Sequence, residues 1–156
     1  MPSEPATSTP VSLLEKVREA VPDRDVLLIS DHPPSPVPEW VAMTLSSTET
    51  LAMPRLESRH ACGLILTPWM EPEQVDAVIA HLRDFLSLEL YVLHPGDTLE
   101  QARRMGALGL RCLEIFDADG QPWGLNHFSL KTYKKTPSWL NSRFWANPQR
   151  WNKFRW

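Results

Sequence analysis

Glycine is scarce in this sequence, whose 156 residues contain six glycines and fifteen prolines. No GxGxxG, P-loop or GxSxG pattern is present, so the motifs of dinucleotide-binding proteins, NTPases and serine esterases are missing. Long apolar runs are missing too, since no segment approaches the ~20 apolar residues that a membrane-spanning helix needs. The opening MPSEPATSTP has neither a basic start nor an apolar stretch, so it does not resemble a secretory signal, and we expect a cytoplasmic protein.

Cysteine is rarer still, with only Cys62 and Cys112 in the chain. Both lie in apolar, strand-like runs, so we expect two buried thiols in a reducing cytosol rather than a disulfide. Apolar burial raises the pKa of a thiol, which argues against a nucleophilic cysteine. We expect neither a catalytic residue nor a metal site, because the histidines at positions 32, 60, 81, 94 and 127 lack the spacing of metal ligands.

Acidic residues are absent from one end of the chain. Residues 120–156 carry seven Lys or Arg and no acid, a net charge of +7, whereas residues 1–119 carry 19 acids and nine Lys or Arg, a net charge of −10. The overall net charge of −3 is the sum of these two values. Such asymmetry indicates a basic end that binds an acidic partner or folds back on the acidic body.

Strand-like and helical patterns alternate along the rest of the chain. We expect the fold class to be α/β, a Rossmann-like sandwich with a mainly parallel sheet, a C-terminal antiparallel hairpin and a tryptophan-rich helical tail. Apolar runs predict strands at 25–30, 61–67, 88–94, 110–116 and 123–133, and periodicity and capping signals predict helices at 13–21, 72–86 and 98–108. The segment EWVAMTL fits either a helix or a strand, and residues 46–58 look irregular or weakly helical.

The chain divides into three parts by composition. Residues 1–10 hold three prolines and few apolar groups, which predicts a disordered N-terminal tail. Residues 11–135 form the predicted α/β domain. Residues 136–156 form a basic, tryptophan-rich extension, in which Thr136-Pro137 and Asn147-Pro148 predict the starts of two short helices.

The second half of the predicted domain resembles a known enzyme family. A strand at 61–67, a helix, a strand ending in HPGD, a helix ending in ALGL and a final hairpin are similar to the second half of class I S-adenosylmethionine-dependent methyltransferases. Those enzymes commonly have a Pro-Gly after the fifth strand and a seventh strand antiparallel to the sixth. The resemblance covers residues 59–133 and implies a Rossmann-like core. The chain also looks like a small uncharacterised bacterial family with a degenerate form of this core, which implies no known activity.

The first half departs from the methyltransferase pattern. The family has a glycine-rich turn after strand one, whereas this chain has SDHPPSPVP, with no glycine. Proline lacks an N–H group and its ring blocks a close approach, so this loop cannot hold a cofactor as glycines do. We therefore expect no cofactor and a non-catalytic binding or adaptor protein. The alternatives are a structural subunit of a larger assembly, or an active methyltransferase that binds S-adenosylmethionine and acts on RNA or another anionic substrate.

Polar residues follow each of three predicted parallel strands. In open α/β sheets, ligands bind outside the carboxyl ends of the strands, so these residues are the candidates for cofactor binding, with a histidine as acid or base. The same residue types also occur at strand ends as plain turn formers, and the sequence favours that structural role. The six candidates are Asp31, His32, Thr67, Trp69, His94 and Asp97.

The closing stretch WLNSRFWANPQRWNKFRW holds four of the seven tryptophans and four basic residues. Aromatic faces stack on bases and cations neutralise phosphates, which suits a nucleic acid. The same composition suits a protein partner, a membrane surface or packing on the chain's own core. The predicted contact residues for a protein or nucleic-acid partner are Arg143, Trp145, Arg150, Trp151, Lys153, Phe154, Arg155 and Trp156.

Overall fold

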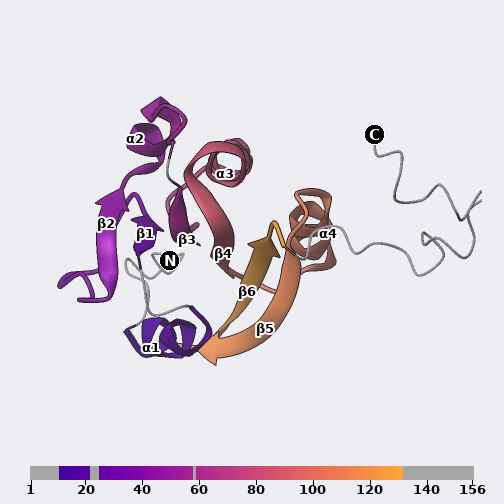
Figure 1. Cartoon of the computed structure of the whole chain (residues 1–156). Coiled ribbons are helices and arrows are strands. Elements are labelled where there is room, and N and C mark those ends of the chain that lie inside the picture. Colours follow the sequence, from indigo (N-terminus) through magenta and orange to yellow (C-terminus); the bar gives the residue numbers. More distant parts are fainter. Residues whose placement is uncertain (1–10, 22–24, 58, 132–156) are drawn as a thin grey trace, which may run out of the picture.

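A computed structural model describes residues 11–21, 25–57 and 59–131 of the chain. Its centre is a six-stranded sheet in the order β2-β1-β3-β4-β6-β5 (Figure 1). The strands are β1 (Val26–Ile29), β2 (Val41–Leu45), β3 (His60–Leu66), β4 (Ser87–Pro95), β5 (Arg111–Ala118) and β6 (Gln121–Ser129). The helices are α1 (Val11–Ala20), α2 (Ser47–Ala52), α3 (Pro72–His81), the π-helical turn η1 (Leu82–Leu86) and α4 (Leu99–Ala107).

The sheet is parallel over its first four positions and antiparallel at one end. Strand β1 pairs in parallel with both β2 and β3, and β3 pairs in parallel with β4. Strand β6 runs antiparallel between β4 and β5 and pairs with both. The predicted α/β fold with a final antiparallel hairpin is therefore confirmed in the described residues. The predicted helical tail lies outside them, as do the proposed domain limits at residues 10 and 136.

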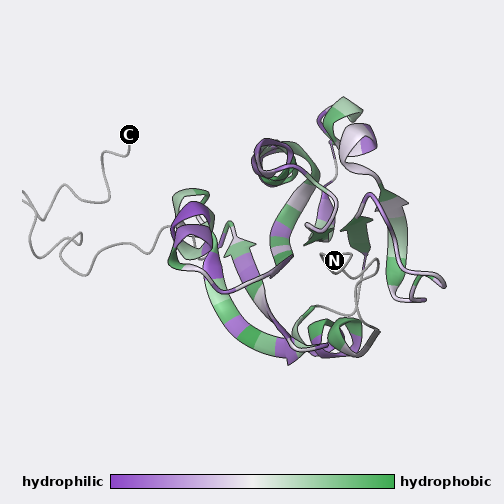
Figure 2. Cartoon of the chain, turned by 180° about the vertical axis from the view of Figure 1, so that it is seen from behind, coloured by the Kyte–Doolittle hydropathy of each residue, from purple (hydrophilic) through white to green (hydrophobic). Residues whose placement is uncertain are grey.

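Two hydrophobic cores lie on opposite faces of the sheet. Helix α1 packs on one face, where Leu14 and Val17 join the core with Leu64 of β3. Helices α3 and α4 pack on the other face, where Val78 and Met105 join the second core. Figure 1 shows α1 on the side of the sheet opposite α3. All four residues of β1 are buried, as expected for a parallel strand covered on both faces. Figure 2 shows β1 as uniformly hydrophobic.

Local signals placed most helix boundaries correctly. Pro72 stands at the start of α3, and Thr98 with Gln101 forms the expected capping box of α4. Gly109 has a φ of +87° and ends α4, because its N–H bonds to Gly106 while the N–H of Leu110 bonds to Met105. These two bonds make a Schellman motif. The helix predicted at 72–86 has its expected length, but its last turn is the π-helical η1.

Two segments left undecided by the sequence have regular structure. EWVAMTL contains β2, which extends the parallel sheet beside β1. The stretch predicted as irregular or weakly helical contains α2, whose capping box joins Ser46 and Glu49. The Ser-x-x-Glu spacing of that box is visible in the sequence, and it is the signal that would have predicted this helix.

The prediction of two buried cysteines is half correct. Cys62 on β3 is completely buried, and burial raises the pKa of its thiol to about 12. Cys112 on β5 is exposed, so the prediction was wrong for this residue. The reason is the sheet order, since β5 is an edge strand and lacks a neighbour on one side. No helix in the described part of the chain is long and apolar enough to cross a membrane.

Candidate functional site at the carboxyl edge of the sheet

The strand order reverses at β1. The chain passes from β1 to β2 on one side and then crosses to β3 on the other side of β1. In open α/β sheets, the crevice at such a reversal, outside the carboxyl ends of the strands, is the usual ligand site. Asp31 and His32 follow β1 here, and Thr67 and Trp69 follow β3. The structure therefore brings these predicted residues to one edge.

Asp31 is engaged by the chain itself. Its carboxylate accepts a hydrogen bond of 2.8 Å from the backbone N–H of Ser47 and one of 3.0 Å from the Ser47 hydroxyl. Ser47 is buried and its hydroxyl oxygen also accepts a hydrogen bond from the amide of Gln74. This chain of bonds joins the end of β1, the start of α2 and the first half of α3. These internal contacts cross the part of the crevice above β1, which we call closed in this sense.

The proline-rich loop after β1 is anchored over the same region. The backbone N–H of His32 donates to the Ser30 hydroxyl at 3.2 Å. The His32 ring lies 4.9 Å from the Trp69 ring, centre to centre, at an angle of 59°. Figure 1 shows α2 and α3 side by side at this edge, which is where a cofactor would need an opening. Through this ring contact, the loop after β1 packs against the segment that follows β3.

A pocket of about 280 Å³ lies beside the crevice, above β3 and β4 and between α3 and α4. Three of the six predicted residues line it, namely Thr67, Trp69 and His94. Asp97 is exposed and does not line this pocket. The six candidates are therefore split: three line the pocket, Asp31 bonds to Ser47 across the crevice, His32 packs on Trp69, and Asp97 takes part in neither place.

His94 is held rigidly at the floor of the pocket. The side chain is 7% exposed, and burial lowers the pKa of its imidazole, so the neutral form is favoured. The amide of Asn126 donates to His94 Nε2 at 2.8 Å, which leaves the proton on Nδ1, 3.4 Å from the carbonyl oxygen of Pro95. A Cβ at Gly124 would lie 2.9 Å from the imidazole ring, so the glycine makes room for it.

Three other polar residues around the pocket were not among the predicted site residues. Gln101 donates to the carbonyl of Pro95 at 2.8 Å and fixes the turn between β4 and α4. Arg104 of α4 holds Asp76 of α3 through two bonds of 2.8 and 2.7 Å, and these bonds raise the pKa of the guanidinium. Asn126 lies on β6. Only Gln101 had a visible signal, its capping box, because the partners of the other two are about thirty residues away.

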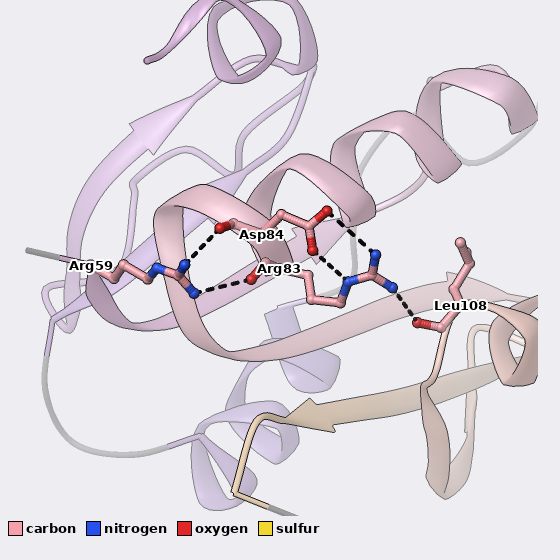
Figure 3. Close-up of polar contacts among 4 residues, drawn as sticks. All are labelled: Arg59, Arg83, Asp84 and Leu108. Atoms are coloured by element: carbon pink, nitrogen blue, oxygen red, sulfur yellow. Dashed lines mark hydrogen bonds and ion pairs between the residues drawn. The ribbon is translucent and has the colours of Figure 1, made fainter. Parts of the chain in front are cut away.

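A second polar cluster surrounds η1, at the C-terminal end of the helix that begins with α3, and has a structural role (Figure 3). Arg59 donates to the carbonyls of Arg83 and Asp84 at 3.4 and 2.7 Å. Arg83 pairs with the Asp84 carboxylate at 2.9 Å and donates to the carbonyl of Leu108 at 3.2 Å. Cations at a helix C-terminus satisfy its unpaired carbonyls in this way. Among the described residues, no group of three metal-ligating side chains occurs.

Comparison with known proteins gives a family without an assigned role. Residues 8–156 match the family described as "Family of unknown function (DUF6231)", and the chain belongs to this family. No curated protein matches the sequence.

Solved structures with a similar fold include several methyltransferases. The S-adenosylmethionine-bound magnesium protoporphyrin IX methyltransferase of Synechocystis PCC 6803 has a TM-score of 0.45 and 13% identity, over 74% of this chain and 75% of that chain. A methyltransferase from Aquifex aeolicus has a TM-score of 0.47 and 11% identity, over 72% and 87%. The glycopeptide N-methyltransferase MtfA has a TM-score of 0.48 and 8% identity, over 76% and 88%.

The predicted Rossmann-like, methyltransferase-like core is present in this chain. The reversal of strand order at β1 is the Rossmann-like feature. Strand β6 pairs antiparallel with β5, as the sequence resemblance implied, and the structure places it between β4 and β5. These are similarities of fold.

Proposed function

We propose that this member of a family of unknown function is a non-catalytic, cytoplasmic binding or adaptor protein built on a methyltransferase-like core. The observation that carries the proposal is the hydrogen-bonded chain of Asp31, Ser47 and Gln74 across the crevice where the fold would hold a cofactor. These groups already pair with one another. A cofactor at this crevice would therefore meet polar groups above β1 that are already engaged in internal hydrogen bonds.

Displacing this closure would be costly. A cofactor that drew Asp31 away from Ser47 would have to replace two bonds, one of them from a backbone N–H of a residue that is 1% exposed. A buried donor left without a partner costs about 1–3 kcal/mol. The loop after β1 has few donors to offer in return, because its four prolines at positions 33, 34, 36 and 38 have no N–H to donate. Both features support loss of cofactor binding.

Calorimetric titration of the full-length protein with S-adenosylmethionine tests this proposal. We expect no saturable heat at millimolar ligand. Saturable binding would overturn the proposal and favour the methyltransferase alternative. In that case Asp31→Ala should weaken binding, whereas Asp97→Ala, at an exposed residue of the same edge, should leave it unchanged.

The proposed contact surface of this protein is the basic tail 131–156, which includes the extension 136–156 and of which residues 132–156 lie outside the described residues. Its charge indicates an acidic partner, either a nucleic acid or an acidic protein surface. Single-stranded RNA of mixed sequence is a suitable probe, followed by tryptophan emission, because five of the seven tryptophans lie at or after position 123. For a nucleic-acid partner we expect quenching that weakens steeply as salt rises.

A triple variant separates contact from self-packing. Replacing Arg150, Lys153 and Arg155 by glutamine removes three cations and should reduce the salt dependence of RNA binding. Blue-shifted emission that RNA leaves unchanged would contradict a nucleic-acid partner and indicate that the extension packs on the chain itself.

A further inference from the structure

We infer that the pocket between α3 and α4 binds a small, uncharged, planar ring compound that carries a hydrogen-bond acceptor. This inference deepens the proposed function, because it names the kind of ligand that a non-catalytic binding protein of this fold would hold. Its basis is the pocket's shape, its walls, its polar groups and its charge.

The walls of the pocket suit a flat apolar ring. They combine an indole, two thioethers and aliphatic side chains, supplied by Pro68, Trp69, Met70, Pro72, Val75 and Met105. Aromatic rings pack well against indole faces and methionine sulfur. The volume of about 280 Å³ is near the lower limit of ligand pockets, so a single ring system fits better than a whole nucleoside.

Trp69 is held in an unfavourable backbone conformation at this pocket. Its φ is +74°, in the left-handed region that bulky residues avoid, and its side chain is 40% exposed. Such a backbone conformation is costly for a Trp, and strain of this kind clusters at ligand sites. A glycine at this position would be free of the strain. Because the chain has a tryptophan there instead, we infer that the strained turn serves to place the indole at the pocket.

Two polar groups in the pocket point to an acceptor on the ligand. The Thr67 hydroxyl makes no hydrogen bond to the part of the chain that the structure describes. The Nδ1 proton of His94 has only the 3.4 Å contact to Pro95, which is long for a hydrogen bond. Both groups can donate to a carbonyl or ring nitrogen. A ligand oxygen or nitrogen that accepted both bonds would fix the ring's orientation.

The pocket lining carries no unpaired charge, which favours an uncharged ligand. Arg104 is the cation in its lining, and Asp76 neutralises it through two short bonds. No carboxylate lines the pocket, and His94 is neutral at its floor. An anion would meet no unpaired cation there, and a cation would meet no acid. Placing a charge in such apolar surroundings without a partner is unfavourable.

Methionine methyl groups report directly on this pocket. Benzamide is a suitable probe, since it is flat, uncharged and carries a carbonyl acceptor. In the full-length protein labelled with ¹³C-methyl methionine, benzamide should shift the Met70 and Met105 signals by ring current. The Met43 signal, on the exposed side of β2, should stay in place. We expect a dissociation constant on the order of 1 mM, about −4 kcal/mol for so small a ligand.

Probes and variants of matched shape make the test decisive. Benzoate and benzylamine are nearly isosteric with benzamide but charged, and should bind at least tenfold more weakly. Trp69→Gly removes the indole and relieves the backbone strain, so a loss of at least tenfold in affinity would not reflect misfolding. Thr67→Val keeps the shape and removes the hydroxyl, for an expected loss of several-fold. Phe85→Ala, at an exposed aromatic outside the pocket, should change nothing.

Three results would overturn the inference: absent shifts at Met70 and Met105, equal binding of the charged probes, or an unchanged affinity of Trp69→Gly. The proposed function fails separately. Binding of S-adenosylmethionine together with a benzamide response contradicts only the non-catalytic proposal. If neither S-adenosylmethionine nor benzamide binds, only the pocket inference is contradicted.

Discussion

Two neighbouring parts of the sheet's carboxyl edge carry similar residues and use them differently. Above β1, Asp31 and Ser47 satisfy each other and bind Gln74, so the crevice is closed. Above β3 and β4, Thr67 and His94 face an open pocket. The difference is that the polar groups above β1 pair with one another, whereas the Thr67 hydroxyl above β3 has no partner among the described residues and lines the pocket. Four predictions test this contrast.

Asp31→Ala should have the largest effect, because it removes both acceptors of Ser47 and opens the closed crevice. We expect the free energy of unfolding to fall by about 3 kcal/mol, the upper end of the cost of unpaired buried donors. Urea denaturation measures this loss. Asp31→Asn keeps one acceptor and should lose less. Asp97→Ala, at the exposed end of the same edge, should stay within about 0.5 kcal/mol of the parent protein. Equal losses at positions 31 and 97 would contradict the closure.

Gly124→Ala tests the rigid floor of the open pocket. The added methyl would lie 2.9 Å from the His94 ring, which Asn126 holds in place. We expect a loss of about 2 kcal/mol in unfolding free energy, and weaker benzamide binding because His94 must move into the pocket. Gly106→Ala is the matched control. No atom lies within 4 Å of its added methyl in α4, so this change should stabilise the helix by up to about 1 kcal/mol. A harmless Gly124→Ala would show that the floor is loose.

The stability of the protein should depend on pH through His94, which belongs to the pocket above β3 and β4 and not to the crevice above β1. Burial lowers its pKa in the folded state below the ordinary value of about 6.5, so above that pH both states are neutral and His94 contributes nothing. Below it, the unfolded chain binds a proton that the folded chain refuses. Stability therefore falls with decreasing pH, by up to about 1.4 kcal/mol per unit, until the folded-state pKa is reached.

Urea denaturation at pH 7.5, 6.5 and 5.5 measures this slope. His94→Gln should flatten it, since glutamine does not titrate. His32→Gln, at the exposed ring beside Trp69, is the matched control and should leave the slope close to that of the parent protein. Equal flattening by both changes would show that His94 is not the group responsible.

The rate of Cys62 alkylation should show the smallest effect. It compares a ligand of the open pocket, benzamide, with a ligand of the closed crevice, S-adenosylmethionine. In Cys112→Ser, Cys62 is the single thiol, and its burial means that it reacts when the sheet opens. Benzamide at five times its dissociation constant should slow alkylation about sixfold, or about 1 kcal/mol, because it binds only the folded state. S-adenosylmethionine at the same concentration should leave the rate unchanged. Slowing by S-adenosylmethionine alone would reverse the assignment of the closed and open parts.

The sequence by itself determined the local elements of this protein. Apolar runs located five of the six strands, Pro72 and Thr98 located two helix starts, and Gly109 located a helix end. The hairpin of β5 and β6 was predicted as well. These features depend on backbone preferences and on side-chain bonds within a few residues, so a single stretch of sequence records them.

Only the tertiary structure decided which polar residues come together. Asp31 meets Ser47 across 16 positions, Arg104 meets Asp76 across 28, and His94 meets Asn126 across 32. Strand order likewise buried Cys62 in the middle of the sheet and left Cys112 on its edge, although the two runs look alike in sequence. The physical reason is that strand order and register bring distant residues together, and a side chain's burial and hydrogen bonds depend on those neighbours.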